Sequence, residues 1–257
     1  MTMATSYSST ELLACVAARL LEDRKSVFVG TGLPMIAAML AQRTHAPGLL
    51  IIFEAGGIGP QIPVLPISVG DSRTFHKAVA ASSMHDVMSI SQAGYLDYGF
   101  LGAAQIDPFG NINTTVIGEH DHPTVRLPGS GGANDVGSFC HRTIIIMRQD
   151  QRKFAAQLDF LTTPGYLTGP GARERAGLPA NTGPHRVITQ LGVYGFDSTT
   201  KIICLLASHP GITVDEIQAN SSFPIPISEP LTITDAPTSE ERRILREIDP
   251  TALLIGR

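Results

Sequence analysis

The apolar positions of this chain follow two patterns, a helical spacing of three to four residues and short continuous runs. Residues 9–22 show the helical spacing behind Ser9, which is typical of a capped helix. Continuous apolar runs occupy 26–29 and 49–53, and a helical pattern at 35–43 separates them. Such runs are typical of strands that are covered on both faces, as in parallel sheets. The order strand, glycine loop, helix, strand, glycine loop therefore predicts βαβ units with right-handed crossovers.

The rest of the chain continues this alternation. Helices are expected at 71–88 and 240–248. Later strands are expected at 98–104, 143–147, 187–190 and 201–207, with a turn near Gly195 between the last two. These elements predict an α/β fold with an open mixed, largely parallel sheet and helices on both faces. Since no internal repeat and no long linker interrupts them, residues 1–257 are expected to form a single domain.

Composition narrows the class of protein. Hydrophobic residues make up 43% of the chain and charged residues 16%, which is enough apolar material for a sizeable core. The formal net charge is -4 and Lys and Arg do not cluster, which argues against a nucleic-acid partner. No apolar run reaches the roughly 18 residues that span a bilayer, and no signal peptide is recognisable. The three cysteines, Cys15, Cys140 and Cys204, form no disulfide framework, so a cytoplasmic location is expected.

Glu54 stands where the second apolar run ends. In open α/β sheets, ligands bind outside the carboxyl ends of the strands. A carboxylate there has a low-dielectric interior behind it, and Gly56 and Gly57 let a ligand approach the backbone. This arrangement suits a nucleophile that attacks an activated acyl group, with exposed amides to stabilise the oxyanion. The alternative is that Glu54 only caps the loop or the next helix.

Two further glycine clusters are candidate ligand loops. One spans 128–134 and includes Gly131 and Gly132; it lacks the lysine of a P-loop and does not match the dinucleotide fingerprint. It can form a backbone nest for a phosphate or a thioester oxygen, or else a mobile surface loop. The other contains Gly30 and Gly32 between a strand and a helix, which favours ligand contact.

Two charged segments have competing interpretations. Residues 119–122, Glu-His-Asp-His, contain metal-ligand types, but adjacent positions do not place them on one face, so a solvated turn without a metal is expected. Arg173 and Arg175 could hold a carboxylate or a phosphate. The alternative is that this pair lies on the surface or in an ion pair.

Several segments, in this order, resemble those of a known family: VGTGLP at 29–34, FEAGGIG at 53–59, GAAQIDPFGNIN at 102–113, GSGGAN at 129–134, GPGARERAGLP at 169–179 and HPGIT at 209–213. The chain is similar to the B subunit of the class I coenzyme A transferases, and most of all to the glutaconate branch of that family. The resemblance covers nearly the whole chain.

The resemblance implies a mechanism and a partner. Glu54 matches the glutamate that attacks the acyl-CoA thioester, forms an acyl–glutamyl anhydride and then carries CoA as a glutamyl-CoA thioester. A homologous A subunit is expected to complete the active site, in a heterodimer or heterotetramer. CoA is then a substrate, and no permanently bound cofactor is expected. The residues expected to line the CoA and acyl site are Gly30, Gly32, Gly56, Gly57, Gln105, Asn111, Gly131 and Gly132.

One departure keeps other functions open. Ala55 follows the nucleophile where the glutaconate branch of the family has serine. Relatives with the same fold decarboxylate or hydrolyse CoA esters, so a lyase or hydrolase acting on a glutaconyl-type CoA ester is the alternative to CoA transfer. A non-catalytic partner subunit is a third hypothesis. The acyl group and the acceptor acid are not determined by the sequence.

Overall fold

The computed structural model describes residues 7–256, which divide into two compact units. Unit 1 consists of the described residues of Met1–Ser89 and Asp235–Arg257, and unit 2 is Ile90–Thr234. The assignment of 1–257 to a single domain stays a prediction. The described residues contain no helix that is long and apolar enough to cross a membrane.

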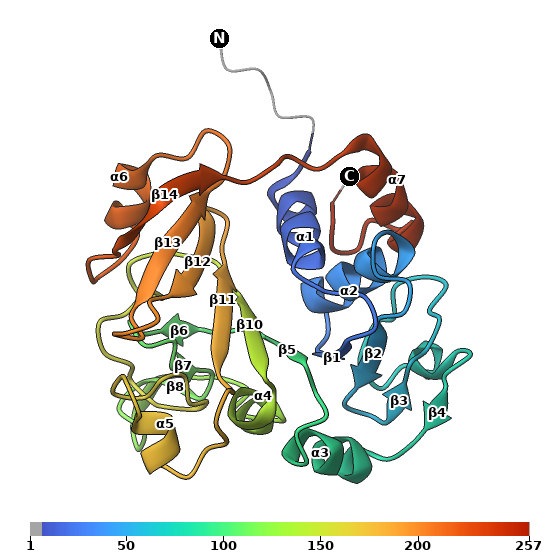
Figure 1. Ribbon diagram of the computed structural model, residues 1–257, viewed down its shortest axis with the longest axis horizontal. Coiled ribbons are helices and arrows are strands. Elements are labelled where there is room, and N and C mark those ends of the chain that lie inside the picture. Colours follow the sequence, from blue (N-terminus) through green and yellow to red (C-terminus); the bar gives the residue numbers. More distant parts are fainter. Residues whose placement is uncertain (1–6, 257) are drawn as a thin grey trace. The chain divides into compact units, whose positions relative to one another are not determined.

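Unit 1 contains helices and a small mixed sheet (Figure 1). Its elements are α1 Ser9–Arg19, β1 Ser26–Val29, α2 Leu33–Arg43, β2 Leu50–Phe53, β3 Gly57–Ile58, the 3-10 helix η1 Ser72–Phe75, β4 Ala80–Ala81 and α7 Ser239–Ile248, while α3 Met84–Gln92 continues into unit 2. Strands β1 and β2 are parallel, and β3 and β4 add antiparallel pairs beside β2. The predicted strands at 26–29 and 49–53 are confirmed.

Helices α1, α2 and α7 pack together, because α2 is apolar on nearly all sides (Figure 1). Residues 35–41 of α2 are all buried. The cap of α1 is Ser8 rather than Ser9, and its side chain and that of Glu11 form a capping box. A part-buried ion pair between Arg19 and Glu241, 2.6 Å between Nη2 and Oε2, joins α1 to α7.

Unit 2 is built on a longer sheet with the strand order β14-β13-β12-β11-β10-β5. Its strands are β5 Tyr98–Leu101, β10 Arg142–Ile146, β11 Pro184–Ile188, β12 Gly192–Phe196, β13 Ile203–Ser208 and β14 Ile227–Ile233. Two small hairpins are formed by β6 Gln105–Ile106 with β7 Ile112–Asn113 and by β8 Val116–Gly118 with β9 Pro123–Arg126. The helices are α4 Ala133–Phe139, α5 Ala172–Arg175 and α6 Val214–Ala219. The pairs β5–β10, β10–β11 and β13–β14 are parallel.

Two predictions about elements are wrong. Residues 71–88 do not form one helix: they form η1, the short strand β4 and the start of α3, because the backbone near Thr74 and Ser82 packs closely against the glycines of β3 and its loop. Gly195 lies within β12 and not in a turn, and it pairs with Cys204. A side chain at Gly195 would clash with Leu206, since a Cβ there would lie 2.7 Å from its Cδ1.

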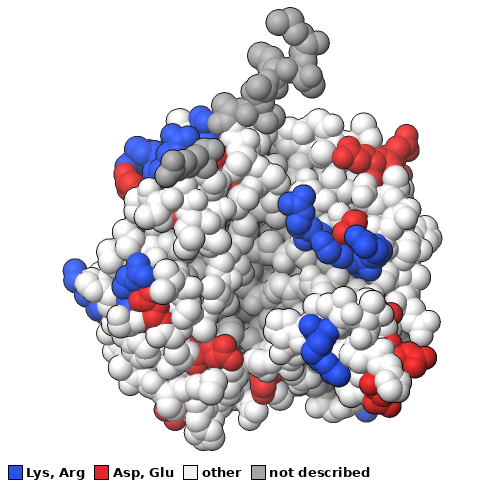
Figure 2. All heavy atoms as spheres, turned by 180° about the vertical axis from the view of Figure 1, so that it is seen from behind, with Lys and Arg blue, Asp and Glu red and all other residues white. Residues whose placement is uncertain are grey.

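The fold class is confirmed, an α/β fold with an open mixed, largely parallel sheet and helices. The charged side chains are scattered over it. On the face shown in Figure 2, Lys and Arg form small groups beside Asp and Glu and no continuous basic surface.

Candidate active site

Glu54 lies directly beyond the carboxyl end of β2, as predicted. The parallel register pairs Val29 of β1 with Phe53 of β2, so Gly30 and Glu54 leave the sheet of unit 1 side by side at one edge. Adjacent strands are about 4.8 Å apart, which brings the loop after β1 next to this carboxylate. Phe53 is fully buried and Glu54 is half-buried.

The Glu54 carboxylate forms no contact that stabilises the described fold through a hydrogen bond or an ion pair. Within residues 7–256 it accepts no hydrogen bond and forms no ion pair. The capping alternative therefore lacks the hydrogen bond it requires. A half-buried carboxylate without a partner, at the end of a buried strand, is available to react with a ligand.

The amino terminus of α2 lies at the same edge. Its N-cap residue is Gly32, with φ of 92°, and no side chain caps the first turn. Pro34 has no N–H and the Met35 amide donates to the Gly32 carbonyl at 3.1 Å, so Leu33 offers the free amide at the positive end of the helix dipole, which stabilises negative charge. A Cβ placed on Gly30 or Gly32 would meet no atom of the described chain within 4 Å. The backbone at both glycines is thus open to a ligand.

Gly56 and Gly57 are glycines for a different reason. A Cβ on Gly56 would lie 2.0 Å from the carbonyl oxygen of Ser82, and one on Gly57 would lie 2.2 Å from that of Thr74. Gly56 also has φ of 114°. Close packing against the 74–82 backbone therefore requires both glycines, whether or not a ligand approaches them.

In unit 2, the loop 129–132 is anchored on both sides and open in its middle. Thr114 and Gly129 form two hydrogen bonds. The Thr114 carbonyl accepts from the Gly129 amide at 2.8 Å, and the Thr114 hydroxyl donates to the Gly129 carbonyl at 2.8 Å. The Asn134 side chain donates to the Thr162 carbonyl at 3.2 Å. A Cβ added to Gly131, whose φ is 48°, would meet no described atom within 4 Å. These anchors favour the backbone nest over the mobile-loop alternative.

Gln105 has its polar atoms engaged inside unit 2. It is 7% exposed, and its Nε2 donates to Asp159 Oδ2 at 3.1 Å. Its Oε1 accepts from Asn113 Nδ2 at 2.7 Å and from the Asp159 amide at 3.1 Å. These bonds give Gln105 a positioning role in the hairpin that precedes loop 129–132.

Asn111 is likewise committed to the fold. It is 4% exposed, and its Oδ1 accepts the amides of Gly165 at 2.7 Å and Leu167 at 3.0 Å. Its Nδ2 donates to Asp107 Oδ2 at 2.7 Å. Burial raises the pKa of Asp107, and this hydrogen bond opposes the rise. Asn111 thus fastens the turn 107–111 to the segment around Tyr166.

Arg173 does not lie on the surface or in an ion pair, which was one of the two expectations for it. It is 3% exposed, and its guanidinium donates to the Thr182 hydroxyl and to the backbone carbonyls of Pro164, Gly165, Gly137 and Ser138. Desolvation by burial lowers the pKa of Arg173. Arg175, in contrast, is exposed. The segment 119–122 forms the exposed turn between β8 and β9, as expected.

Two residues that hold loop 129–132 were not predicted, Thr114 and Thr162. A single threonine before a glycine cluster carries no recognisable pattern, because its hydrogen-bond partner is distant in sequence. The nearest indication was the motif that ends at Asn113, whose side chain accepts the Thr115 amide at 2.9 Å.

Known proteins are similar to this chain in sequence and in fold. The chain is 38% identical over 246 residues to the B subunit of 3-oxoadipate CoA-transferase from Pseudomonas knackmussii, covering 95% of this chain and 94% of that protein. It is 37% identical over 252 residues to the B subunit of glutaconate CoA-transferase from Acidaminococcus fermentans, covering 96% and 94%. The crystal structure of that glutaconate CoA-transferase matches with a TM-score of 0.93 and 36% identity, over 99% of this chain and 100% of the other.

A second similar structure belongs to a protein that is named as a decarboxylase. The crystal structure of the decarboxylase AibA/AibB matches with a TM-score of 0.83 and 27% identity, over 98% of this chain and 100% of the other. The family model described as coenzyme A transferase matches residues 10–220. The resemblance found in the sequence is thereby confirmed: this chain belongs to the coenzyme A transferase family.

Proposed function

We propose that this chain is the B subunit of a heteromeric enzyme that transfers CoA between carboxylic acids, with Glu54 as the nucleophile. The observation that carries the proposal is the register of β1 and β2, which sets an unpartnered carboxylate beside an open glycine loop and an uncapped helix terminus. A carboxylate nucleophile needs a neighbouring donor for the oxyanion, and the Leu33 amide at the start of α2 is the proposed donor.

The proposed reaction has four steps. The Glu54 carboxylate attacks the thioester carbonyl, the C–S bond breaks, and an acyl–glutamyl anhydride and CoA thiolate form. The thiolate attacks the glutamyl carbonyl, which releases the first acid as a carboxylate and leaves glutamyl-CoA. The second acid attacks this thioester and expels the thiolate, which then attacks the new acyl group. The last step frees Glu54 and releases the new acyl-CoA.

The glycines of the two open loops are the proposed contacts for CoA and the acyl group. Gly30 and Gly32 have free space above their backbone, as does Gly131, which is followed by Gly132 at the N-cap of α4. Gly56, Gly57, Gln105 and Asn111 remain part of the proposed site, and the contacts described above favour positioning roles for them. Both anhydride and thioester hydrolyse in water, so closely fitting loops also protect the intermediates.

The partner and substrate are proposed from the relatives. Two of them are named as B subunits, which supports an A subunit as partner, in a heterodimer or heterotetramer. Their names refer to 3-oxoadipate and glutaconate, both dicarboxylic acids, so a dicarboxylic acyl-CoA is the proposed substrate class. A cytoplasmic location is also proposed, and the unpaired cysteines fit a reducing compartment.

Trapping of the intermediate tests the function. The chain is combined with its A partner and an acyl-CoA, treated with borohydride, and digested for mass spectrometry. Reduction of the Glu54 side chain to an alcohol is the expected result, with no such change in Glu54→Gln. If Glu54 remains a carboxylate while the complex turns over acyl-CoA, transfer through Glu54 is wrong.

Decarboxylation is the second candidate, favoured by Ala55 and by the similarity to the decarboxylase AibA/AibB. Such an enzyme releases carbon dioxide from a glutaconyl-type CoA ester and needs no acceptor acid. An assay with and without acetate separates the two functions. Carbon dioxide release without an acceptor, together with full activity of Glu54→Gln, would favour the lyase.

A further inference from the structure

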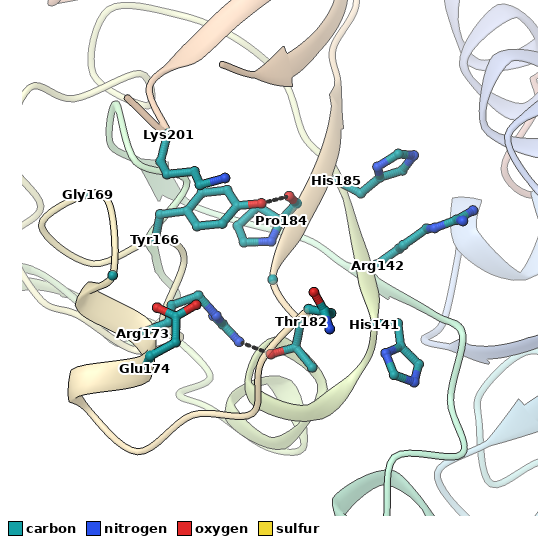
Figure 3. Close-up of a pocket in the computed structure, with 13 residues that line it drawn as sticks. His141, Arg142, Tyr166, Gly169, Arg173, Glu174, Thr182, Pro184, His185 and Lys201 are labelled. Carbon is teal, nitrogen blue, oxygen red and sulfur yellow. Dashed lines mark hydrogen bonds between the residues drawn. The ribbon is translucent and has the colours of Figure 1, made fainter. Parts of the chain in front are cut away.

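A pocket of about 340 Å³ opens in unit 2, at the amino ends of β10 and β11 (Figure 3). Arg142 begins β10 and Pro184 begins β11, and both line it. Loop 129–132 precedes α4, whereas the pocket residue His141 follows α4. Since α4 packs along β5, the pocket and the loop lie at opposite edges of this sheet.

The lining of the pocket is predominantly cationic. Arg173 and Lys201 carry positive charges at neutral pH, and Arg142 adds a third although its side chain points away from Lys201 (Figure 3), whereas Glu174 is the only acid among the lining residues. Clustered charges of one sign in a concave site raise the local concentration of ions of the opposite sign. The pocket therefore attracts anions.

Arg173 adds a buried charge that the protein does not neutralise by direct contact. Every group that accepts its hydrogen bonds is uncharged, four backbone carbonyls and one hydroxyl. Its Nε–H has no hydrogen-bond partner among the described residues. A buried cation without a bonded counter-ion is costly, and an anion in the adjacent cavity would offset part of that cost.

The rim holds Lys201 over the pocket. Its ammonium lies 5.4 Å from the centroid of the Tyr166 ring, and the Tyr166 hydroxyl donates to the Pro184 carbonyl at 2.9 Å. Lys201 and Asn181 have φ of 62° and 60°, a left-handed backbone that is uncommon for lysine and more frequent for asparagine. Among residues 7–256, no carboxylate lies within salt-bridge distance of Lys201.

We propose that this pocket binds a small oxyanion, a phosphate or a carboxylate group, with Lys201 at the anion and Arg173 as the charged wall. A water molecule occupies about 30 Å³, so the pocket accommodates a ligand of roughly ten heavy atoms, the size of a small phosphate ester or dicarboxylate. The site uses none of the residues proposed for CoA transfer, and its existence is independent of that function.

Isothermal titration calorimetry on the complex with its A partner tests the proposal. The probes are inorganic phosphate and glutarate, added separately at constant ionic strength. Saturable binding is expected for at least one probe, and the tighter one identifies the oxyanion. We expect Lys201→Gln to weaken binding about tenfold, because a charged hydrogen bond is lost, and Lys201→Arg to retain it. The control Lys153→Gln removes an ammonium elsewhere, which pairs with Asp150, and should leave binding unchanged.

A second measurement uses the unmodified protein. The rate at which acetic anhydride modifies the Lys201 amine, followed by mass spectrometry, should fall when the tighter-binding probe is present, while the rate at Lys153 stays constant. Absence of saturable binding by both probes overturns the proposal. Equal binding by Lys201→Gln and the unmodified chain, or equal acetylation with and without the anion, also overturns it.

Discussion

Glu54 and Arg173 are charged side chains beside glycine-rich segments, yet their surroundings differ completely. Glu54 is half-buried and makes no hydrogen bond within the described chain. Arg173 is 3% exposed and donates to five groups. Burial of an ionised group is tolerated only with many partners. Glu54 is thus free for chemistry, while Arg173 is required for the fold around it.

Replacement of Arg173 should therefore affect stability. Arg173→Met leaves buried carbonyls without donors, so the free energy of unfolding should fall by about 3 kcal/mol. Urea unfolding followed by circular dichroism measures this change. The exposed neighbour provides the control, since Arg175→Met should change stability by less than about 0.5 kcal/mol. Equal stability of Arg173→Met and the unmodified chain would contradict the structural role.

Two glycines near Glu54 should respond differently to the same added methyl group. Gly56→Ala places a Cβ 2.0 Å from the Ser82 carbonyl oxygen at a φ of 114°, so we expect a loss of about 2 kcal/mol or more in unfolding free energy. Gly30→Ala meets no described atom within 4 Å, so stability should be unchanged. If CoA or its acyl group approaches Gly30, the KM for acyl-CoA should rise severalfold. An unchanged KM would remove Gly30 from the proposed site.

At the scale of elements, short apolar runs were the most reliable guide. The strand at 26–29 has the predicted bounds and the helix at 35–43 begins only two residues earlier, at Leu33. Both are buried on all sides, so hydrophobicity alone decides them. The helix predicted at 71–88 is wrong because the conformation of this segment depends on residues distant in sequence, such as Gly57, which pairs with Ala81. Local periodicity carries no information about such pairs.

Loop 129–132 yields a prediction about an element. The Thr114 hydroxyl donates to the Gly129 carbonyl at 2.8 Å, so Thr114→Val should loosen the loop, whereas Thr114→Ser keeps the hydroxyl. If the loop contacts CoA, Thr114→Val should raise the KM for acyl-CoA about fivefold or more, because about 1 kcal/mol of hydrogen bonding is lost. Steady-state kinetics of the complex with its A partner measure this. Identical kinetics of the two variants would show that the anchor is irrelevant to binding.

At the scale of the whole molecule, His209 connects the ends of several strands. It is 1% exposed; its Nδ1 lies 2.7 Å from the Thr234 hydroxyl and its Nε2 lies 2.8 Å from the Thr189 carbonyl. Because a carbonyl only accepts, Nε2 carries the proton of the neutral ring. Burial lowers the pKa of His209 below 6.5, and the bond to Thr189 only partly opposes this.

Stability should consequently depend on pH. Near and below pH 6.5, the unfolded chain binds a proton at His209 that the folded chain does not. The contribution of His209 to the free energy of unfolding is therefore at its maximum above pH 6.5 and decreases as the pH falls below that value. Urea unfolding at about pH 7.5 and about pH 5.5 measures the fall. The variant His209→Gln does not titrate and should lose less stability between the two pH values. An equal loss in both proteins would assign the acid sensitivity to other groups.

The sequence by itself determined the buried strands, the helices between them, the glycine loops at strand ends and the position of Glu54 beside one of them. These features depend on local hydrophobicity and on order along the chain. Only the tertiary structure decided that Gly56 and Gly57 are needed for packing. It also decided that Asn111 and Arg173 form hydrogen bonds with amides and carbonyls of distant loops. The same holds for the cationic residues that line the pocket at the amino ends of β10 and β11. Those outcomes depend on which distant groups meet once the strands pair, because burial favours a partner for most polar groups.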